Sequence, residues 1–268
     1  MKVKVNEKWI EVCESKDLYS LKKEVLEEAD IVVLNGYPIN ENKVLKENDR
    51  VVFIKKGIVP TKDELEALMV SRHSPGVHEK LKKLKVCIAG CGGLGSNIAI
   101  SLARLGIGYI KLIDFDVVEP SNLNRQQYYI DDIGEFKSLA LKKNIERINP
   151  FIKVEAEVML ITEDNMDVLN EVNVVLEAFD NAEYKAMLSN YVLRNMREKY
   201  LIAASGMAGF YDSNLIKTRK ITDKFYLCGD EVNEAKEGDG LMAPRVAICA
   251  NHMANLVLKI AVEKWEEV

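Results

Sequence analysis

A cluster of glycines at positions 90–95 is the first part of the sequence whose spacing suggests chemistry. Gly90, Gly92 and Gly95 follow the G-x-G-x-x-G pattern, and Asp114 comes nineteen residues after Gly95. Glycines let a backbone pass close to phosphates, a helix N-terminus favours negative charge, and an acid ending the next strand can hold a ribose hydroxyl. The pattern predicts a nucleotide site; the alternative is a tight strand-to-helix turn without a ligand.

Charged and amide side chains beyond the glycines indicate which nucleotide binds. Asn122 and Arg125 lie in the run SNLNRQQ, Lys137 follows a glycine turn, and Asp180 ends a later apolar run. Two positive charges and an amide suit a triphosphate, and a further carboxylate suits Mg²⁺, a hard cation that takes oxygen ligands. Arg72, upstream of the glycines, is a third cationic candidate. ATP with Mg²⁺ is favoured over NAD, because a dehydrogenase would leave these residues unused.

Alternating strand and helix patterns supply the scaffold for these side chains. This alternation predicts an α/β fold with a doubly wound, mainly parallel, Rossmann-like sheet, whose ligands bind at the carboxyl ends of strands. Gly90, Asp114, Asp180 and Ser205 all follow apolar runs and are expected at such ends. The apolar runs that predict strands are 85–89, 109–113, 153–158, 172–178 and 200–204.

The last third of the chain changes character. Residues 209–221 and 224–228 are expected to form strands, predicted to be antiparallel, and the acidic stretch 231–240 is expected to be a mobile loop. A helix is expected at 163–171, and a long helix with a nearly continuous apolar face follows Leu241.

The first 57 residues read as a separate small α+β unit, in which one helix crosses a mixed sheet. A capping-box pattern at Thr61–Glu64 starts a further helix after Pro60. We therefore place the domain boundary at 57–61, between an N-terminal domain of residues 1–57 and a second domain of residues 61–268. The segments that carry the N-terminal pattern are 3–5, 9–12, 18–26, 31–34 and 50–54.

Composition narrows the function classes. The formal net charge of −5 argues against general nucleic-acid binding. No apolar run approaches the ~20 residues of a membrane helix, and the N-terminal residues lack the apolar core of a signal peptide, so a cytoplasmic location is expected. The five cysteines are odd in number and form no Cys-x-x-Cys pair, so neither a disulfide framework nor structural zinc is expected.

Residues 85–265 resemble the ThiF/MoeB family, the bacterial relatives of ubiquitin-activating enzymes. The motifs GCGGLG, LIDFD, SNLNRQ, GEFK, FDN and GLMAPRV occur in family order, and SNLNRQ after D-x-D is the most specific. The resemblance implies a homodimer that binds MgATP and adenylates the C-terminal glycine of a carrier protein. A sulfur donor, which the sequence does not identify, then converts the carrier to a thiocarboxylate.

The resemblance implies a role for each matched residue. Asp114 would bind the ribose, with Asp116 beside it at the nucleotide, and Asp180 would bind Mg²⁺. Arg72 would reach into the ATP site of the partner protomer. The glycines that would form the phosphate loop are Gly90, Gly92, Gly93 and Gly95. The residues that would hold the phosphates and stabilise displacement at the α-phosphorus are Asn122, Arg125 and Lys137.

Each of these roles has a plainer alternative. Arg72 is otherwise a solvated loop arginine, Lys137 a surface lysine at a helix start, and Asp180 a helix N-cap, which can coexist with metal binding. Some members of the family use a cysteine before the final helix in sulfur transfer. Cys228 is the candidate here, and a packed strand-end thiol is the alternative.

Residues 1–57 resemble the ThiS/MoaD sulfur carriers, which have the ubiquitin-like β-grasp fold. The resemblance lies in VLNGYPI, in ENDRVVFI and in the overall length. Carriers end in a free Gly-Gly carboxylate, whereas this strand runs on through Lys55-Lys56-Gly57-Ile58-Val59. This domain therefore cannot be a substrate as it stands, and a docking module, a pseudo-carrier and a stabilising appendage stay open.

The pairing of Tyr226-Leu227-Cys228-Gly229-Asp230 with GLMAPRV resembles a compact, zinc-less ThiF subgroup associated with thiamine synthesis. That resemblance favours a Gly-Gly-ended, ThiS-like carrier as the partner. The alternatives are a MoaD-type carrier, a small carboxylate as in relatives that act on tRNA-bound threonylcarbamoyl groups, a NAD-dependent oxidoreductase, and a carrier-binding protein without catalysis.

Overall fold

The computed structural model describes residues 1–70, 73–74 and 76–263, and the chain divides into two compact units, residues 1–74 and 75–268. The boundary predicted at 57–61 assigns the helix after Pro60, α2 (Lys62–Val70), to the second domain, whereas the compact units group it with the first. That boundary stays a prediction.

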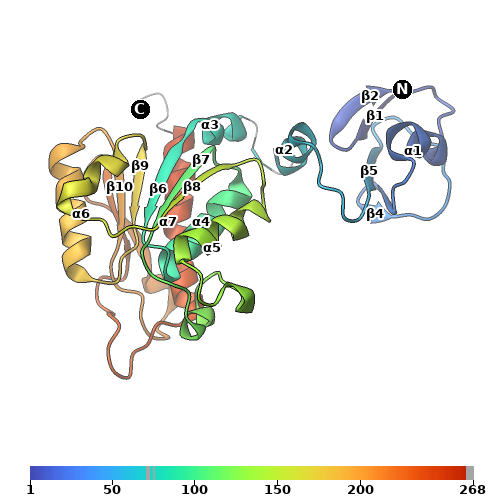
Figure 1. The fold of residues 1–268 in the computed structure, drawn as a ribbon. Coiled ribbons are helices and arrows are strands. Elements are labelled where there is room, and N and C mark those ends of the chain that lie inside the picture. The colour runs from blue at the N-terminus through green and yellow to red at the C-terminus, as the bar shows by residue number, and fades with distance from the viewer. Residues whose placement is uncertain (71–72, 75, 264–268) are drawn as a thin grey trace. The chain divides into compact units, whose positions relative to one another are not determined.

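The N-terminal unit is a five-stranded mixed sheet with one helix packed against it (Figure 1). Its strand order is β2-β1-β5-β3-β4, and β1 and β5 are parallel. Valines alternate along β1, so Val3 and Val5 face a core that contains Leu18 and Leu21 of the helix and Phe53 of β5. The elements are β1 (Lys2–Val5), β2 (Lys8–Glu11), α1 (Leu18–Leu26), β3 (Ile31–Leu34), β4 (Tyr37–Pro38) and β5 (Arg50–Ile54).

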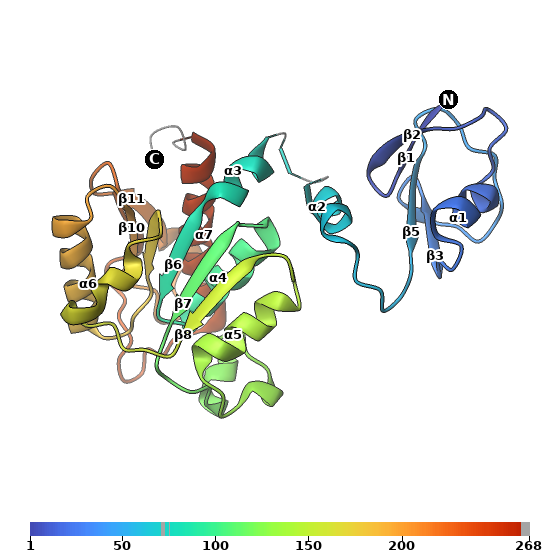
Figure 2. The same ribbon diagram turned by 45° about the horizontal axis from the view of Figure 1, so that its top comes forward.

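The second unit is built on a seven-stranded sheet of order β11-β12-β10-β9-β6-β7-β8. Figure 2 shows β6, β7 and β8 side by side. The predicted parallel, Rossmann-like sheet is confirmed. Its strands are β6 (Lys85–Ala89), β7 (Tyr109–Ile113), β8 (Lys153–Glu157), β9 (Val174–Glu177), β10 (Tyr200–Ala204), β11 (Lys217–Lys220) and β12 (Phe225–Gly229).

Helices cover both faces of this sheet, because successive side chains of a strand point to opposite sides. Val86 and Ile88 of β6 face a core with α3, α4, α5 and α7, whereas Cys87 and Ala89 face α6 and the 3-10 turn at 163–169. The helices of this unit are α3 (Val77–Lys83), α4 (Gly93–Leu105), α5 (Lys137–Glu146), α6 (Ala182–Asn195) and α7 (Ala243–Glu263).

Two details differ from the sequence prediction. In the expected strand at 209–221 only Lys217–Lys220 pairs. It is antiparallel to β12, as predicted, but β12 itself is parallel to β10, so β11 alone is antiparallel within the described part of this sheet. The expected helix at 163–171 is a 3-10 segment, Glu163–Leu169, interrupted at Asn165. Both errors concern short segments, in which few side chains carry a periodic signal.

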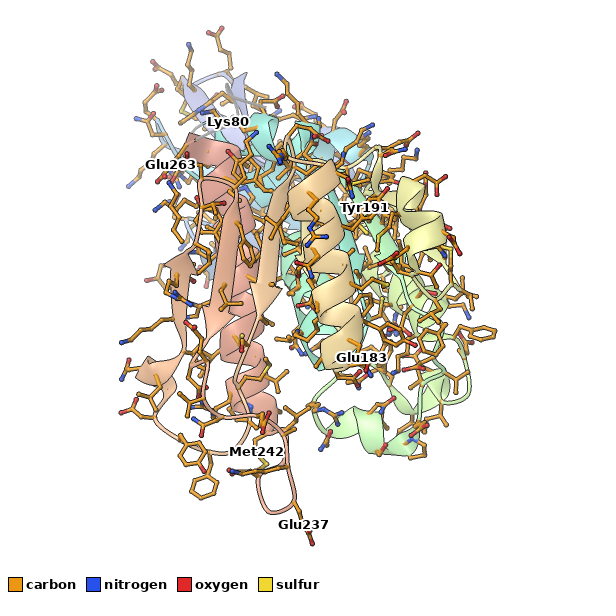
Figure 3. The ribbon with its side chains drawn as sticks, turned by 90° about the vertical axis from the view of Figure 1, so that its left-hand side faces the viewer. Lys80, Glu183, Tyr191, Glu237, Met242 and Glu263 are labelled. Atoms are coloured by element: carbon orange, nitrogen blue, oxygen red, sulfur yellow. The ribbon has the colours of Figure 1, made fainter. Side chains whose placement is uncertain are left out.

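The final helix, α7, is the long apolar element of the unit. By length and composition alone it could cross a membrane, which corrects the expectation that no run approaches that length. Half of its most apolar stretch is buried inside the protein, where it packs along α4. Figure 3 shows α7, between Met242 and Glu263, on the opposite side of the sheet from α6, which carries Glu183 and Tyr191.

The glycines between β6 and α4 permit a very close approach of strand and helix. A Cβ at Gly95 would lie 1.8 Å from the Gly90 carbonyl oxygen. A Cβ at Gly90, whose φ is +95°, would lie 2.8 Å from the carbonyl oxygen of Ala178. Both positions therefore require glycine, one for helix packing and the other for the turn.

We predict that Gly95→Ala lowers the free energy of unfolding by about 1–3 kcal/mol or more, because the added methyl group cannot fit without moving backbone. Urea denaturation would measure the loss. Gly240→Ala is the control, since a Cβ there meets nothing within 4 Å. Equal stability of the two variants would contradict the packing argument.

Candidate active site

The loop from Gly90 to Gly93 presents the N-terminus of α4 at the carboxyl edge of the sheet. Gly92 is the N-cap, and no side chain of the described residues caps it. The first amide groups of a helix have no partner within the helix, and the helix dipole makes that end attractive to anions. This end of α4 is therefore suited to a phosphate.

Asp114, directly after β7, braces this loop. Its Oδ2 accepts a 2.6 Å hydrogen bond from the amide of Cys91, and its Oδ1 accepts one of 2.8 Å from the amide of Asp116. Burial raises the pKa of Asp114, and these two bonds and the Lys137 charge act against that rise. The carboxylate is thus fixed beside the glycine loop, where its remaining lone pairs could accept from a ribose hydroxyl.

Asp116 and Lys137 form an ion pair beside Asp114. The Lys137 Nζ lies 2.7 Å from Asp116 Oδ2, and the Lys137 amide donates to the Asp116 carbonyl at 2.8 Å. Lys137 is only 8% exposed. A lysine at the first position of α5 opposes the helix dipole, so the aspartate offsets an unfavourable placement. Lys137 is therefore not a solvated surface residue.

Asn122 and Arg125 come from one short segment, the 3-10 turn Pro120–Asn124. The Asn122 side-chain oxygen accepts a 3.0 Å bond from the amide of Glu119, and its carbonyl accepts one of 3.1 Å from the amide of Arg125. The Arg125 side chain lies beside the loop, because a Cβ at Gly93 would be 3.7 Å from its Cγ and Nε. Asn122 therefore shapes the turn that delivers the arginine.

Two polar atoms at this place are buried without a partner. Arg125 Nε and Gln126 Oε1 make no hydrogen bond to any described residue. Gln126 also lies beside the loop, since a Cβ at Gly92 would be 3.9 Å from its Nε2. Buried polar groups are nearly always hydrogen-bonded in native proteins, so the orphaned atoms next to an uncapped helix N-terminus suit a polar ligand.

Asp180 lies at the end of the neighbouring strand, three residues after β9. It is exposed, and no hydrogen bond or ion pair joins it to the part of the chain that the structure describes. Asn181, not Asp180, caps α6, by accepting from the amides of Glu183 and Tyr184 at 2.8 and 3.1 Å. The Asp180 carboxylate is thus available to a ligand.

Arg72, the remaining predicted site residue, lies outside the residues that the structure describes.

Cys228 is a buried residue of β12. Its Sγ lies 3.6 Å from Thr218 Oγ1, and burial raises its pKa to about 11. A thiol that stays protonated and covered is a poor nucleophile, so this placement favours the packed-thiol alternative over sulfur transfer. Burial likewise raises the pKa of Cys87 and of Cys249 to about 12 and that of Cys91 well above its usual value.

Sequence reasoning missed several residues that support the site. The Tyr128 hydroxyl lies 2.7 Å from the Cys91 carbonyl and 3.2 Å from that of Lys137, so it can donate to either. Glu177 and Lys185 form an ion pair behind Asp180. The available signal was Glu177 itself, a carboxylate inside the otherwise apolar run VVLEA, since such residues are seldom fully buried without a partner.

A second buried ion pair organises the segment between β10 and α7. Arg245 pairs with Asp230, and both side chains are 4% exposed. The arginine also donates to the carbonyls of Tyr211 and Asp212 at 2.8 and 2.9 Å. The motifs LCGD and GLMAPRV, which carry these two residues, are thus joined in space. Within residues 1–70, 73–74 and 76–263, no group of three or more His, Cys, Asp or Glu side chains is placed to hold a metal ion.

Two known protein families match this chain. The ThiF family matches residues 65–268, and the ThiS-like ubiquitin family matches residues 1–57. The chain belongs to the ThiF family. The two resemblances inferred from the motifs are therefore confirmed, and with them the ubiquitin-like assignment of the N-terminal unit.

Two curated relatives of this ThiF-family chain are sulfur-carrier enzymes. The sulfur carrier protein adenylyltransferase of Thermus thermophilus is 35% identical over 127 residues, covering 45% of this chain and 47% of that protein. The sulfur carrier protein ThiS adenylyltransferase of Bacillus subtilis is 33% identical over 124 residues, covering 45% of this chain and 37% of that protein. The matched regions thus span less than half the length of these relatives.

Solved structures share the fold of the ThiF-family unit. The tRNA N6-threonylcarbamoyladenosine dehydratase of E. coli, determined in complex with ATP, superposes with a TM-score of 0.69 at 23% identity. The superposition covers 78% of this chain and 99% of that chain. Proteins named for different substrates therefore share this scaffold.

We predict that iodoacetamide labels Cys13 alone in the native protein, because Cys13 is exposed and the other four thiols are buried. Mass spectrometry of tryptic peptides, with and without denaturant, would show the difference. Rapid native labelling of Cys228 would contradict its packed placement and revive the sulfur-transfer role.

Proposed function

We propose that this protein is an ATP-dependent adenylyltransferase that activates the C-terminal glycine carboxylate of a ThiS-like sulfur carrier, in thiamine biosynthesis. The names of the curated relatives support a sulfur-carrier enzyme in general. The finer assignment to ThiS draws on the zinc-less LCGD and GLMAPRV pairing. Location in the cytoplasm is part of this proposal.

The observation that carries the proposal is the position of Arg125 beside Gly93. The guanidinium lies next to the uncapped N-terminus of α4, and its Nε is buried without a partner. Arginine presents a planar set of donors that matches phosphate oxygens. A triphosphate placed there would satisfy the orphaned donor and the helix end together. Binding of NAD, by contrast, would leave Lys137 and Asp180 without a role.

The arrangement suits displacement at the α-phosphorus of ATP. In the proposed reaction a carboxylate oxygen of the carrier forms a bond to that phosphorus, the bond to the bridging oxygen breaks, and pyrophosphate leaves with the electron pair. Arg125 and Lys137 would neutralise the negative charge on the phosphate oxygens. Lys137 would exchange its bond to Asp116 for one to a phosphate, and Asp114 would hold the ribose.

Asp180 fits the role of the proposed Mg²⁺ ligand. Mg²⁺ is usually held by one or two carboxylates together with substrate phosphates and water, so a single exposed and unpaired carboxylate at this edge is sufficient on the protein side. When bound, the ion would supply charge neutralisation at the phosphates. Binding of zinc is not part of the proposal.

A homodimer with Arg72 acting across the interface remains part of the proposal on the strength of the family resemblance. The sulfur donor is outside it. Activation of a MoaD-type carrier, or of a small carboxylate, is the competing possibility for the same catalytic residues. The fused ThiS-like unit and the net charge of −5 argue against a tRNA substrate.

We predict that the protein catalyses ATP–pyrophosphate exchange that depends on a Gly-Gly-ended carrier, and that Arg125→Ala and Asp180→Asn each lower kcat/KM about 100-fold. The reason is that Arg125→Ala removes a positive charge that would stabilise the transition state, and Asp180→Asn weakens the ligand that would hold the Mg²⁺ charge there, each at the cost typical of a single such group. Radiolabelled pyrophosphate incorporation into ATP measures the rate.

Arg219→Ala is the matched control. Arg219 is an exposed arginine on β11, and it pairs with Glu231. Its exchange rate is expected to equal that of the wild type. Exchange with ThiS-like but not MoaD-type carriers would support the finer assignment. No exchange with any carrier, or calorimetry in which NAD binds more tightly than MgATP, would contradict the proposal.

Deletion of residues 1–57 tests the N-terminal unit. If the unit is a docking module, the KM for the carrier should rise while the KM for ATP is unchanged. If it is autoinhibitory, the exchange rate should rise. A merely stabilising unit predicts a lower unfolding temperature with unchanged kinetics, and thermal unfolding of the same sample separates this case.

A further inference from the structure

We infer that the buried Glu177 and the partly buried Lys185 form a charged clamp that positions Asp180, and that they are positioning residues for the metal–nucleotide complex. This inference rests on the proposed function, because it gives Asp180 the role of the Mg²⁺ ligand. The clamp itself is seen in the contacts of the segment between β9 and α6.

Glu177, the last residue of β9, is fully buried. Its Oε1 accepts a 2.8 Å hydrogen bond from the amide of Phe179. The Lys185 Nζ donates to both carboxylate oxygens, at 3.0 and 2.7 Å. The carboxylate therefore holds one backbone group of the residue that precedes Asp180.

Lys185 holds the other backbone group of the same residue. Its Nζ donates to the Phe179 carbonyl at 3.1 Å. Phe179 thus has its amide fixed by Glu177 and its carbonyl fixed by Lys185, so both peptide bonds next to it are restrained. The peptide bond from Phe179 leads directly to Asp180, which has no such contacts of its own.

The clamp also ties Asp180 to the glycine loop. A Cβ at Gly90 would lie 3.2 Å from the Phe179 ring and 2.8 Å from the Ala178 carbonyl oxygen. The segment that carries Asp180 therefore packs against the turn that would hold the phosphates. Restraining Phe179 therefore fixes the position of the Asp180 backbone relative to that turn.

The charge pair is hard to explain by stability alone. Burying an ion pair costs desolvation energy, and a well-packed apolar pair of similar volume is often at least as stable. Lys185 also stands in the first turn of α6, where the helix dipole disfavours a cation. Its three donors reach Glu177 and Phe179 from that position, which an apolar side chain could not do.

The experiment measures metal dependence separately from nucleotide dependence. In Lys185→Met we expect the Mg²⁺ concentration for half-maximal pyrophosphate exchange to rise about tenfold, as is typical when a residue that orients a metal ligand is removed. The KM for ATP at saturating Mg²⁺ should change less than about twofold, because the phosphate-binding residues are untouched. Lys185→Arg, which keeps a donor and the charge, should restore the wild-type midpoint.

A second readout does not depend on activity. Mn²⁺ binding to the protein with a non-hydrolysable ATP analogue, followed by electron paramagnetic resonance, should weaken by the same factor in Lys185→Met. Amide hydrogen exchange of a peptide covering residues 178–184 should speed up. Glu177→Gln, which keeps the acceptor for Phe179 and is expected to fold, should show a smaller shift in the same direction.

Lys199→Met is the matched control. Lys199 is a buried lysine that donates to the backbone carbonyls of Asn170 and Val172, both at 2.8 Å. It precedes the first residue of β10 and therefore lies at the edge of the sheet opposite to Asp180. It should lose stability without a change in metal dependence. An unchanged metal midpoint in folded Lys185→Met, or an equal shift in Lys199→Met, would overturn the clamp.

The failure of the proposed function looks different. Wild-type protein that neither binds MgATP nor catalyses exchange would overturn that function. Faster amide exchange in Lys185→Met would then still support a clamp on the Phe179 segment, and unchanged exchange would overturn it. Normal wild-type activity with an unchanged metal midpoint in Lys185→Met overturns the clamp alone.

Discussion

The contact between Gly95 and the Gly90 carbonyl determines where everything else at the site lies. With no Cβ to keep them apart, α4 starts almost on top of the end of β6, so its N-terminus opens at the carboxyl edge of the sheet. In this short loop the amide of Cys91 donates to Asp114 at 2.6 Å. The position of the candidate phosphate site is therefore a consequence of helix packing.

Two loops at this edge are restrained in the same way. Cys91 has its amide held by Asp114 and its carbonyl contacted by the Tyr128 hydroxyl. Phe179 has its amide held by Glu177 and its carbonyl by Lys185. In both cases side chains that are buried or partly buried fix a backbone segment, next to the groups to which the proposed function gives a ligand. In the proposed reaction such restraint would lower the reorganisation needed when charge develops on a bound phosphate.

The sequence was sufficient to predict the alternating strands and helices of the larger sheet. Sequence patterns located the strands of the sheet, and the antiparallel pairing expected between β11 and β12 is confirmed, whereas the parallel pairing of β12 with β10 was not foreseen. The spacing of Gly90 to Asp114 placed the loop. The Asp116–Lys137 pair and the burial of Lys137 were not predictable, because each depends on contacts between separate elements. The pairing of Glu177 with Lys185 depends in the same way on a contact between a strand and a helix, although the carboxylate inside the apolar run VVLEA did signal that Glu177 has a partner.

The shared geometry also bears on substrate choice. Relatives named for sulfur carriers and a fold neighbour named for a tRNA substrate have this scaffold in common. In the proposed function the loop and Asp114 would bind only the nucleotide. Under that proposal the choice of the second substrate depends on other residues. The segment between β10 and α7 differs from the glycine loop in exposing large apolar side chains, Phe210 and Val232, at 84% and 79%, while Arg245 and Asp230 anchor its base.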